Sequence, residues 1–290
     1  MHNRKLSHSQ NFLKSQKLVE SLVRKSGINF SDIVYEIGPG KGIITQELSK
    51  KCKQVVAIET DKNLHADLLK KFGKNTKVKI ILHDFLTFNL PKEEYKIFSN
   101  IPFNLTADII SKITKTDTLP IDTFLIIQRE AALKFSGQPY YKESQYSLLL
   151  KPIFELKIIA KLRKSDFQPQ PKVDTVLLQI KKRKKPLVEK NQIQLYKDFI
   201  VYAFNQWKPT LKKSLRNIFS GIQYNKLSYN LNFHKNSKPT DLKFEQWMGM
   251  FEYFIKGVSE EKKRIAFGSE QKLKQQQSKL QKIHRTRKPV

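Results

Sequence analysis

Residues 36 to 42 read Glu36-Ile37-Gly38-Pro39-Gly40-Lys41-Gly42 and overlap the end of an apolar run that begins at Ile33. Glycines at a turn from a strand into a helix let a ligand approach the backbone at the carboxyl edge of a sheet. A fold that binds nicotinamide dinucleotides would place a third glycine three positions after the second, to receive a pyrophosphate, but this chain has Ile43 there. The stretch therefore favours a ligand without pyrophosphate, with the acidic Glu36 near its positive end.

On both sides of this turn, from Asp32 to about Ile180, short apolar runs alternate with amphipathic stretches. This alternation is typical of an α/β sheet covered by helices. The last two runs have no convincing helix between them, so we expect an antiparallel pair at one edge. The predicted strands are Ile33–Ile37, Val55–Ile58, Val78–Leu82, Lys96–Ser99, Thr123–Ile127, Phe154–Ile159 and Val176–Ile180, and the predicted helices between them include Gly42–Lys50, Asn63–Phe72 and Thr106–Thr114.

The predicted sheet ends at a charged run, Lys181-Lys182-Arg183-Lys184-Lys185-Pro186, which is typical of a linker. We expect a first domain over residues 1–182 and a small all-helical domain over 183–255. The helices predicted in the second domain are Gln192–Phe204, Thr210–Phe219 and Phe244–Phe254. Residues 256–290 carry eleven lysines and arginines against three glutamates and few apolar residues, so we expect a disordered basic tail.

The composition points to a polyanionic partner. The 290 residues include 55 Lys and Arg against 26 Asp and Glu, a formal charge of +29, which suits RNA, DNA or an anionic membrane. No apolar run approaches the roughly 20 residues that span a bilayer, and the N-terminus lacks an apolar signal core. We therefore expect a cytoplasmic protein. We also expect it to be a monomer without a membrane partner. The single Cys52 forms no internal disulfide or Cys-ligated zinc site and is expected to be inert, and the sequence offers no metal cluster.

Two acidic residues follow the next two predicted strands. Glu59 lies nineteen residues after Gly40, where a carboxylate can accept hydrogen bonds from both hydroxyls of a ribose. Asp84 follows the third strand, where it can accept a hydrogen bond from an adenine amino group; the simpler alternative is a helix cap. Each signal is weak alone, but their order after successive strands favours S-adenosylmethionine as the ligand.

The fourth strand runs into Ser99-Asn100-Ile101-Pro102-Phe103-Asn104. The N6 amino group of adenine is a poor nucleophile because its lone pair is delocalised into the ring, so two acceptors for the N6 hydrogens would help to orient it. The side-chain oxygen of Asn100 and the main-chain carbonyl of Ile101 can supply them. Pro102 stiffens the turn and Phe103 offers a face on which a flipped-out base can stack; the alternative is an Asx-type turn with a core phenylalanine.

These motifs, together with Gln10-Asn11-Phe12-Leu13 and Phe167-Gln168-Pro169-Gln170-Pro171-Lys172-Val173, resemble the rRNA adenine N6-dimethyltransferases. The resemblance extends from about Ser9 to Ile180. It implies a Rossmann-like, seven-stranded class I methyltransferase domain that uses S-adenosyl-L-methionine to methylate an adenine in RNA. The family positions that contact the cofactor correspond here to Asn11, Leu13, Gly38, Glu59, Asp84 and Asn100, and the neighbouring Gly40 belongs to the same loop.

Within this family the chain looks most like the Erm type. Those enzymes methylate one adenine in the peptidyl-transferase loop of 23S rRNA and confer resistance to macrolides, lincosamides and streptogramin B. Phe103 stands where tyrosine is common, which keeps the stacking face. The branch that modifies 16S rRNA usually reads Asn-Leu-Pro-Tyr at this loop and remains an alternative. A non-catalytic nucleic-acid-binding protein on the same fold is an alternative from another class.

The resemblance also marks Phe167 as a second stacking partner for the target base; the alternative is that it packs beneath the turn set by Pro169 and Pro171. Several basic groups could contact phosphates, and each could equally be a solvated face. The aromatic residues near some of them have the spacing of helix core positions. The basic groups are Lys181–Lys185, Arg129, Arg163-Lys164, Lys212-Lys213 and Arg216, and the aromatic residues are Phe199, Tyr202, Phe204 and Trp207.

Overall fold

The computed structural model describes residues 11–137 and 142–279, which form two compact units. The first unit comprises residues 11–136 and 153–185, and the second comprises residues 137, 142–152 and 186–279. The main division therefore lies three residues beyond the predicted boundary at 182. The sequence placed residues 137–152 in the first domain, whereas the structure places residue 137 and residues 142–152 in the helical unit.

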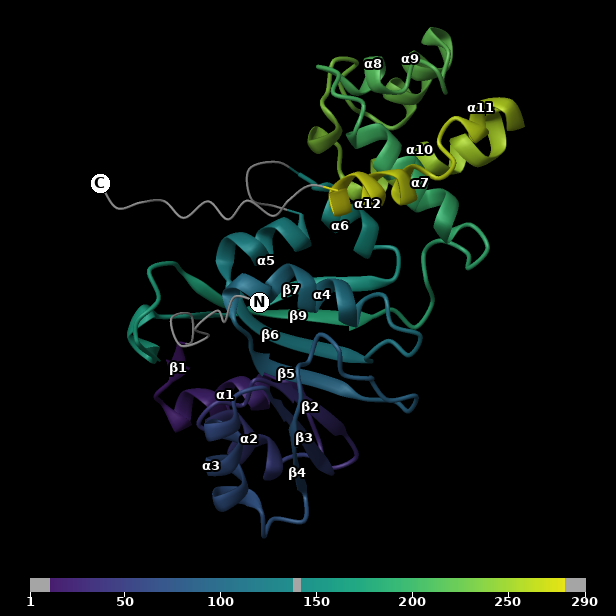
Figure 1. Cartoon of the computed structure of the whole chain (residues 1–290). Coiled ribbons are helices and arrows are strands. Elements are labelled where there is room, and N and C mark those ends of the chain that lie inside the picture. Colours follow the sequence, from purple (N-terminus) through teal and green to yellow (C-terminus); the bar gives the residue numbers. More distant parts are fainter. Residues whose placement is uncertain (1–10, 138–141, 280–290) are drawn as a thin grey trace. The chain divides into compact units, whose positions relative to one another are not determined.

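A seven-stranded sheet in the order β4-β3-β2-β5-β6-β9-β7 forms the centre of the first unit (Figure 1). Strands β4 to β6 are parallel along this order, and β9 lies antiparallel between β6 and β7. The predicted antiparallel pair at one edge is thus confirmed. The strands are β2 (Ile33–Ile37), β3 (Gln54–Glu59), β4 (Val78–Leu82), β5 (Lys96–Asn100), β6 (Asp122–Gln128), β7 (Phe154–Leu162) and β9 (Thr175–Lys182).

Helices of the first unit follow the strands as the apolar spacing predicts. Side chains of α1 and α2 share one core with alternate residues of the strands, such as Val34, Phe98 and Phe124, because successive strand residues face opposite sides of the sheet. The helices are α1 (Gln16–Ser26), α2 (Ile43–Ser49), α3 (Lys62–Phe72), α4 (Thr106–Ile113) and α5 (Arg129–Ser136), with short 3-10 turns η2 (Phe103–Leu105) and η3 (Lys164–Asp166).

The second unit is helical, as predicted. Its core is rich in aromatic rings that pack on Phe199 of α7, among them Trp247 and Phe254 of α10. The predicted helix Thr210–Phe219 is shorter, because only Leu211–Ser214 is helical and turns then bring Leu215 and Phe219 into the core. The helices are α6 (Gln145–Leu150), α7 (Ile193–Phe204), α8 (Leu211–Ser214), α9 (Gly221–Asn230), α10 (Phe244–Gly257), α11 (Glu260–Arg264) and α12 (Ser269–Lys279), with the 3-10 turn η4 (Pro239–Asp241).

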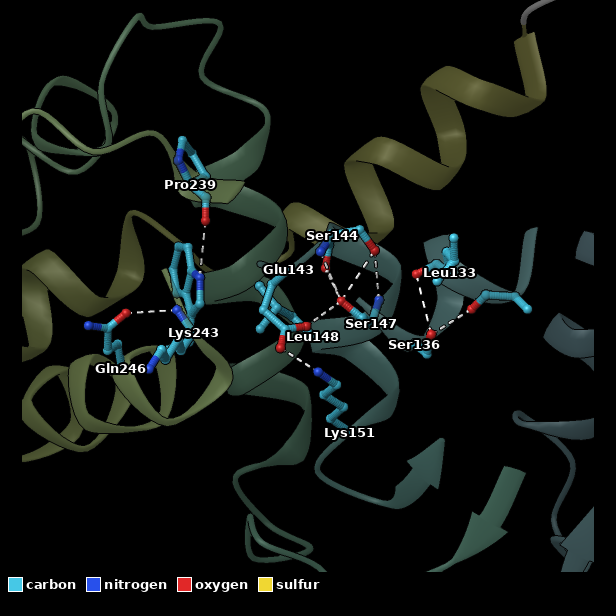
Figure 2. Close-up of polar contacts among 12 residues, drawn as sticks. Leu133, Ser136, Glu143, Ser144, Ser147, Leu148, Lys151, Pro239, Lys243 and Gln246 are labelled. Carbon is cyan, nitrogen blue, oxygen red and sulfur yellow. Dashed lines mark hydrogen bonds and ion pairs between the residues drawn. The ribbon is translucent and has the colours of Figure 1, made fainter. Parts of the chain in front are cut away.

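Helix α6 joins the helical unit through buried contacts that the sequence pattern does not reveal. Leu148 is fully buried in the helical core, and its carbonyl accepts a hydrogen bond from the Tyr196 hydroxyl at 3.0 Å. At the start of α6, Ser147 donates to the buried Glu143 carboxylate, which also pairs with Lys151 (Figure 2). These contacts explain why the segment leaves the first domain.

The expectation of a disordered tail from residue 256 is wrong as far as Lys279; residues 280–290 lie outside the described residues. Helix α12 is anchored at its start, where Asp198 of α7 accepts hydrogen bonds from the backbone amides of Gly268 and Glu270. Gln194 of α7 donates to the Glu270 carboxylate as well. A helix that is too polar to form a core of its own can thus be held in place by a few hydrogen bonds at its start.

Candidate active site

The candidate site lies at the carboxyl edge of the parallel strands of the first unit. Strand order reverses between β2 and β5, and a crevice at such a switch point is where open α/β sheets bind ligands. The ladder between these two strands stops at Tyr35 and Ile97. Beyond it, the Ile37 amide donates to the buried Ser99 hydroxyl at 2.7 Å. The Ser99 hydroxyl thus takes the place of a backbone partner where β2 and β5 diverge.

The glycine loop after β2 needs residues without side chains. Gly38, Gly40 and Gly42 have φ angles of +63°, +58° and +75°, in the left-handed region that other residues rarely adopt. A Cβ atom on Gly40 would lie 2.6 Å from the Phe12 ring. The loop and Phe12 therefore fit together only because position 40 is glycine.

Strand pairing helps to position the N-terminal motif, Asn11 to Leu13, at the candidate site. Strand β1 (Phe12–Leu13) pairs with β8 (Phe167–Gln168). Just before it, the Asn11 carbonyl accepts a hydrogen bond from the Asn100 side-chain amide at 2.7 Å. Two motifs that are 89 residues apart in the sequence are thus joined at the end of β5.

A cavity of about 640 Å³, part of it open to solvent, lies between these segments. Eight of the predicted site residues line it, so the structure brings them together. They are Asn11, Leu13, Gly38, Gly40, Asn100, Ile101, Pro102 and Phe103, and Phe12, Glu36, Pro39, Lys41, Ile43 and Ile44 complete the lining.

Glu59 and Asp84, the other two residues predicted to bind the cofactor, do not line this cavity. Glu59 is buried at the end of β3, where one carboxylate oxygen accepts from the Thr60 and Asp61 amides and the other from the Gly40 amide at 3.1 Å. Because a carboxylate has about four acceptor positions, this leaves about one for a ligand hydroxyl, where the sequence predicted two. Asp84 is exposed after β4 and accepts from the Leu86 amide at 2.8 Å.

Glu36 is the buried acid of the cavity. Burial raises the pKa of this carboxyl to about 8, against the lowering effect of the Thr45 hydroxyl, which donates to it at 2.6 Å. The nearby Glu59 raises the pKa further. A cation placed in the cavity would favour the ionised form, so Glu36 can respond to the charge of a ligand.

The two residues predicted to stack on the target base, Phe103 and Phe167, differ in their exposure. Phe103 is partly exposed and lines the cavity, so its ring is available to a base. Phe167 is fully buried and packs in the same core as Leu13, Leu162 and Leu177. The prediction that Phe167 stacks on the target base is therefore wrong for this structure, because the pairing of β8 with β1 turns its ring into the core.

Sequence reasoning missed two residues near the site. Phe12 covers Gly40, and the alternation of a strand could have placed it opposite Asn11 and Leu13. Lys112 of α4 donates to the carbonyls of Leu86 and Phe88, at 3.0 and 2.5 Å. It thereby holds the loop that follows Asp84, and no local sequence signal marks that role.

Of the predicted basic groups, Arg129 and Lys164 share a second, shallow cavity of about 560 Å³ beyond the end of β6. Lys172 also lines it, and its carbonyl accepts from Lys164 at 2.9 Å. Arg163 is exposed at the start of the neighbouring η3 turn. These side chains are placed where anions could reach them.

Comparison with known proteins decides the family. Residues 1–256 match the model of a family described as ribosomal RNA adenine dimethylase. The chain belongs to this family. It is 33% identical to a ribosomal RNA small subunit methyltransferase A of Oceanobacillus iheyensis, over 75% of this chain and 78% of that protein. It is also 30% identical to an rRNA adenine N-6-methyltransferase of Bacillus licheniformis, over 83% and 84% of the two chains.

A solved structure agrees with this assignment. The crystal structure of the 23S rRNA methyltransferase ErmE superposes with a TM-score of 0.79 at 25% identity, covering 84% of this chain and 100% of that one. The protein is therefore an S-adenosylmethionine-dependent rRNA methyltransferase with a class I methyltransferase fold. Family membership speaks against the non-catalytic alternative.

The cavity fits this cofactor. Gly38 and Gly40 line it without side chains, so a ligand can approach their backbone, and the buried Glu36 carboxyl can ionise when a positively charged ligand binds beside it. Within residues 11–137 and 142–279, no helix is long and apolar enough to cross a membrane.

Proposed function

We propose that this enzyme methylates, and then dimethylates, the N6 amino group of a single adenine in the peptidyl-transferase loop of 23S rRNA, conferring resistance to macrolides, lincosamides and streptogramin B. The observation that carries the adenine chemistry is the hydrogen bond from the Asn100 amide nitrogen to the Asn11 carbonyl. The preference for 23S rRNA is supported by the Asn-Ile-Pro-Phe loop and by the likeness to ErmE.

The Asn100 contact leaves the side-chain oxygen as an acceptor at the cavity wall. An adenine amino group that donates one hydrogen to this oxygen and the other to the Ile101 carbonyl can become pyramidal, so that its lone pair is no longer delocalised into the ring and points at the methyl group. Its nucleophilicity then rises without a general base that removes a proton first. Pro102 and the buried Ile101 side chain fix the backbone that carries these acceptors.

Cofactor binding is assigned to the glycine loop and its surroundings. Asn11, Leu13, Gly38 and Gly40 would contact S-adenosylmethionine, with Glu59 on the ribose and Asp84 on the adenine amino group. This cofactor supplies an electrophilic methyl group on a sulfonium. Glu36 lies in the cavity wall with a carboxyl that can take up or release a proton. The Phe103 ring would hold the flipped-out target base by stacking.

The test of the catalytic assignment is Asn100→Ala. We expect methyl transfer to fall by at least about 100- to 1,000-fold, the loss that follows removal of one positioned polar group in an active site, while the protein still binds radiolabelled S-adenosylmethionine. Asn104→Ala is the matched control, because Asn104 is exposed on the next turn. Full activity in Asn100→Ala would refute the assignment.

A second candidate is methylation of 16S rRNA, favoured by the 33% identity to the small subunit methyltransferase A. Primer extension on rRNA from cells that express the protein separates the two. We expect a stop in the peptidyl-transferase loop of 23S rRNA and reduced macrolide susceptibility of a sensitive host. A stop near the 3′ end of 16S rRNA, without resistance, would support the second candidate.

A further inference from the structure

Trp207 is an unusual residue of the helical unit. It lies in the connection between α7 and α8, is 94% exposed, and has a φ angle of +51°. Its spacing predicted core packing, which holds for Phe199 and Tyr202 but not here. The left-handed region is unfavourable for a bulky residue, and such conformations cluster at functional sites. Both faces of the indole ring are thus open to solvent at a conformational cost.

The connection that presents Trp207 is held on both sides. The Asn205 side-chain amide donates to the Gln145 side chain at 2.8 Å and to the Val201 carbonyl at 2.7 Å. After the tryptophan, the Leu211 amide donates to the Ser237 carbonyl at 2.9 Å. The ring is therefore presented from a fixed backbone, which lowers the entropy lost when a ligand binds it.

The segment of the sequence that carries Trp207 is basic and has no acidic residue. Residues 199 to 240 contain no aspartate or glutamate but seven lysines and arginines. Lys208 is adjacent, and Lys213 and Arg216 are exposed on and just after α8. Exposed basic residues on the same segment as an open aromatic ring are the combination that binds single-stranded nucleic acid, since lysines and arginines contact phosphates and the ring stacks on a base.

We infer that Trp207 is a stacking platform for an unpaired base of the RNA substrate, flanked by phosphate contacts from Lys208, Lys213 and Arg216. The inference rests on the proposed function only in taking RNA as the substrate. Stacking needs a splayed-out base, so the site selects single-stranded or loop RNA over duplex. It assigns to the helical unit the recognition of an unpaired nucleotide in addition to charge attraction.

Fluorescence gives a direct test, because the chain has two tryptophans and Trp247 is fully buried. In the full-length protein we expect single-stranded oligoadenylate to quench the emission and to protect it from acrylamide. Duplex RNA of equal length should do so much less. In Trp207→Phe, which leaves only the buried Trp247, both effects should disappear. Emission that stays fully accessible to acrylamide at saturating oligoadenylate would overturn the inference.

Binding affinity provides the second measurement. Trp207→Ala should weaken oligoadenylate binding about 5- to 150-fold, the range of one stacked base, and Trp207→Phe should restore most of it. Phe30→Ala is the matched control, since Phe30 is 66% exposed near the start of β2 in the other unit. Equal affinities of Trp207→Ala and the wild type would overturn the inference.

The failure of this inference can be told apart from failure of the proposed function. If oligoadenylate binding ignores Trp207 while rRNA is still methylated and Asn100→Ala is inactive, only the stacking role is wrong. If Trp207→Ala weakens binding but no rRNA is methylated, the stacking role stands and the proposed reaction is wrong.

Discussion

The candidate active site and the helical unit handle polar groups in opposite ways. At the sheet edge, the carboxylates Glu36 and Glu59 are buried and already hydrogen-bonded to Thr45 and to backbone amides. In the helical unit, residues 199–240 have no carboxylate at all and expose several lysines and an open tryptophan. A small cofactor can be bound by a few prearranged groups, whereas a polyanion is attracted by exposed charge. Changes at the two regions should therefore have different consequences.

If the site depends on prearranged packing, the largest effect at the cofactor site should come from Gly40→Ala. The new Cβ would clash with Phe12 and strain the left-handed backbone. We expect cofactor affinity to fall about 100-fold, measured by calorimetry. Gly27→Ala is the control, because Gly27 also has a positive φ, of +67°, but nothing lies within 4 Å of its Cβ position. It should lower thermal stability and leave affinity intact. Equal affinities of the two variants would contradict the packing argument.

A smaller loss is expected for Glu59→Gln. Its new amide group would face either the Gly40 amide or the Thr60 and Asp61 amides, placing donor against donor. We expect cofactor affinity to fall about 10- to 100-fold, with circular dichroism showing that the fold persists. Unchanged affinity would mean that the carboxylate is not needed to shape the glycine loop.

Lys112→Met tests whether a residue outside the cavity positions the loop after Asp84. Loss of its hydrogen bonds to Leu86 and Phe88 should raise KM for the cofactor about 5- to 30-fold and leave kcat unchanged. Lys115→Met, at an exposed lysine in the turn after α4, is the control. A fall in kcat with constant KM would point to a role other than positioning.

The smallest predicted effect is the pH dependence that the buried Glu36 gives to stability and to cofactor binding. The pKa of Glu36 is raised from 4.5 to about 8. Between these two pH values the folded protein holds a proton that the unfolded chain has lost. The free energy of unfolding of the ligand-free protein should therefore fall as the pH rises from 4.5 to about 8. A sulfonium favours the ionised carboxyl. Affinity for S-adenosylmethionine relative to S-adenosylhomocysteine, whose sulfur carries no charge, should therefore rise a few-fold, and by at most about tenfold per pH unit, from about pH 6 to 8.

Glu36→Gln is the variant that checks this dependence. It should flatten both the stability curve and the difference between the two ligands, because the titrating group is gone. A pH dependence that survives in Glu36→Gln would assign the effect to another group.

The sheet and the cavity were largely predictable because their signals are local. The apolar runs gave the strands, and the motifs around Gly40 and Asn100 fall where parallel strands end. Features that depend on contacts between distant segments were missed. Phe167 is buried by pairing with a strand at residues 12–13, and α12 is held by Asp198, seventy residues earlier. Trp207 shows the converse, since helical spacing predicted burial and a left-handed turn exposes the ring.

The central claim is that the methyl group goes to the N6 of adenine, and the most direct test is the identity of the modified nucleoside. Purified protein, radiolabelled S-adenosylmethionine and unmodified 23S rRNA should yield N6-methyladenosine and N6,N6-dimethyladenosine after digestion and chromatography. Asn104→Ala should give the same products and Asn100→Ala none. Label in any other nucleoside, or in a ribose, would contradict the account.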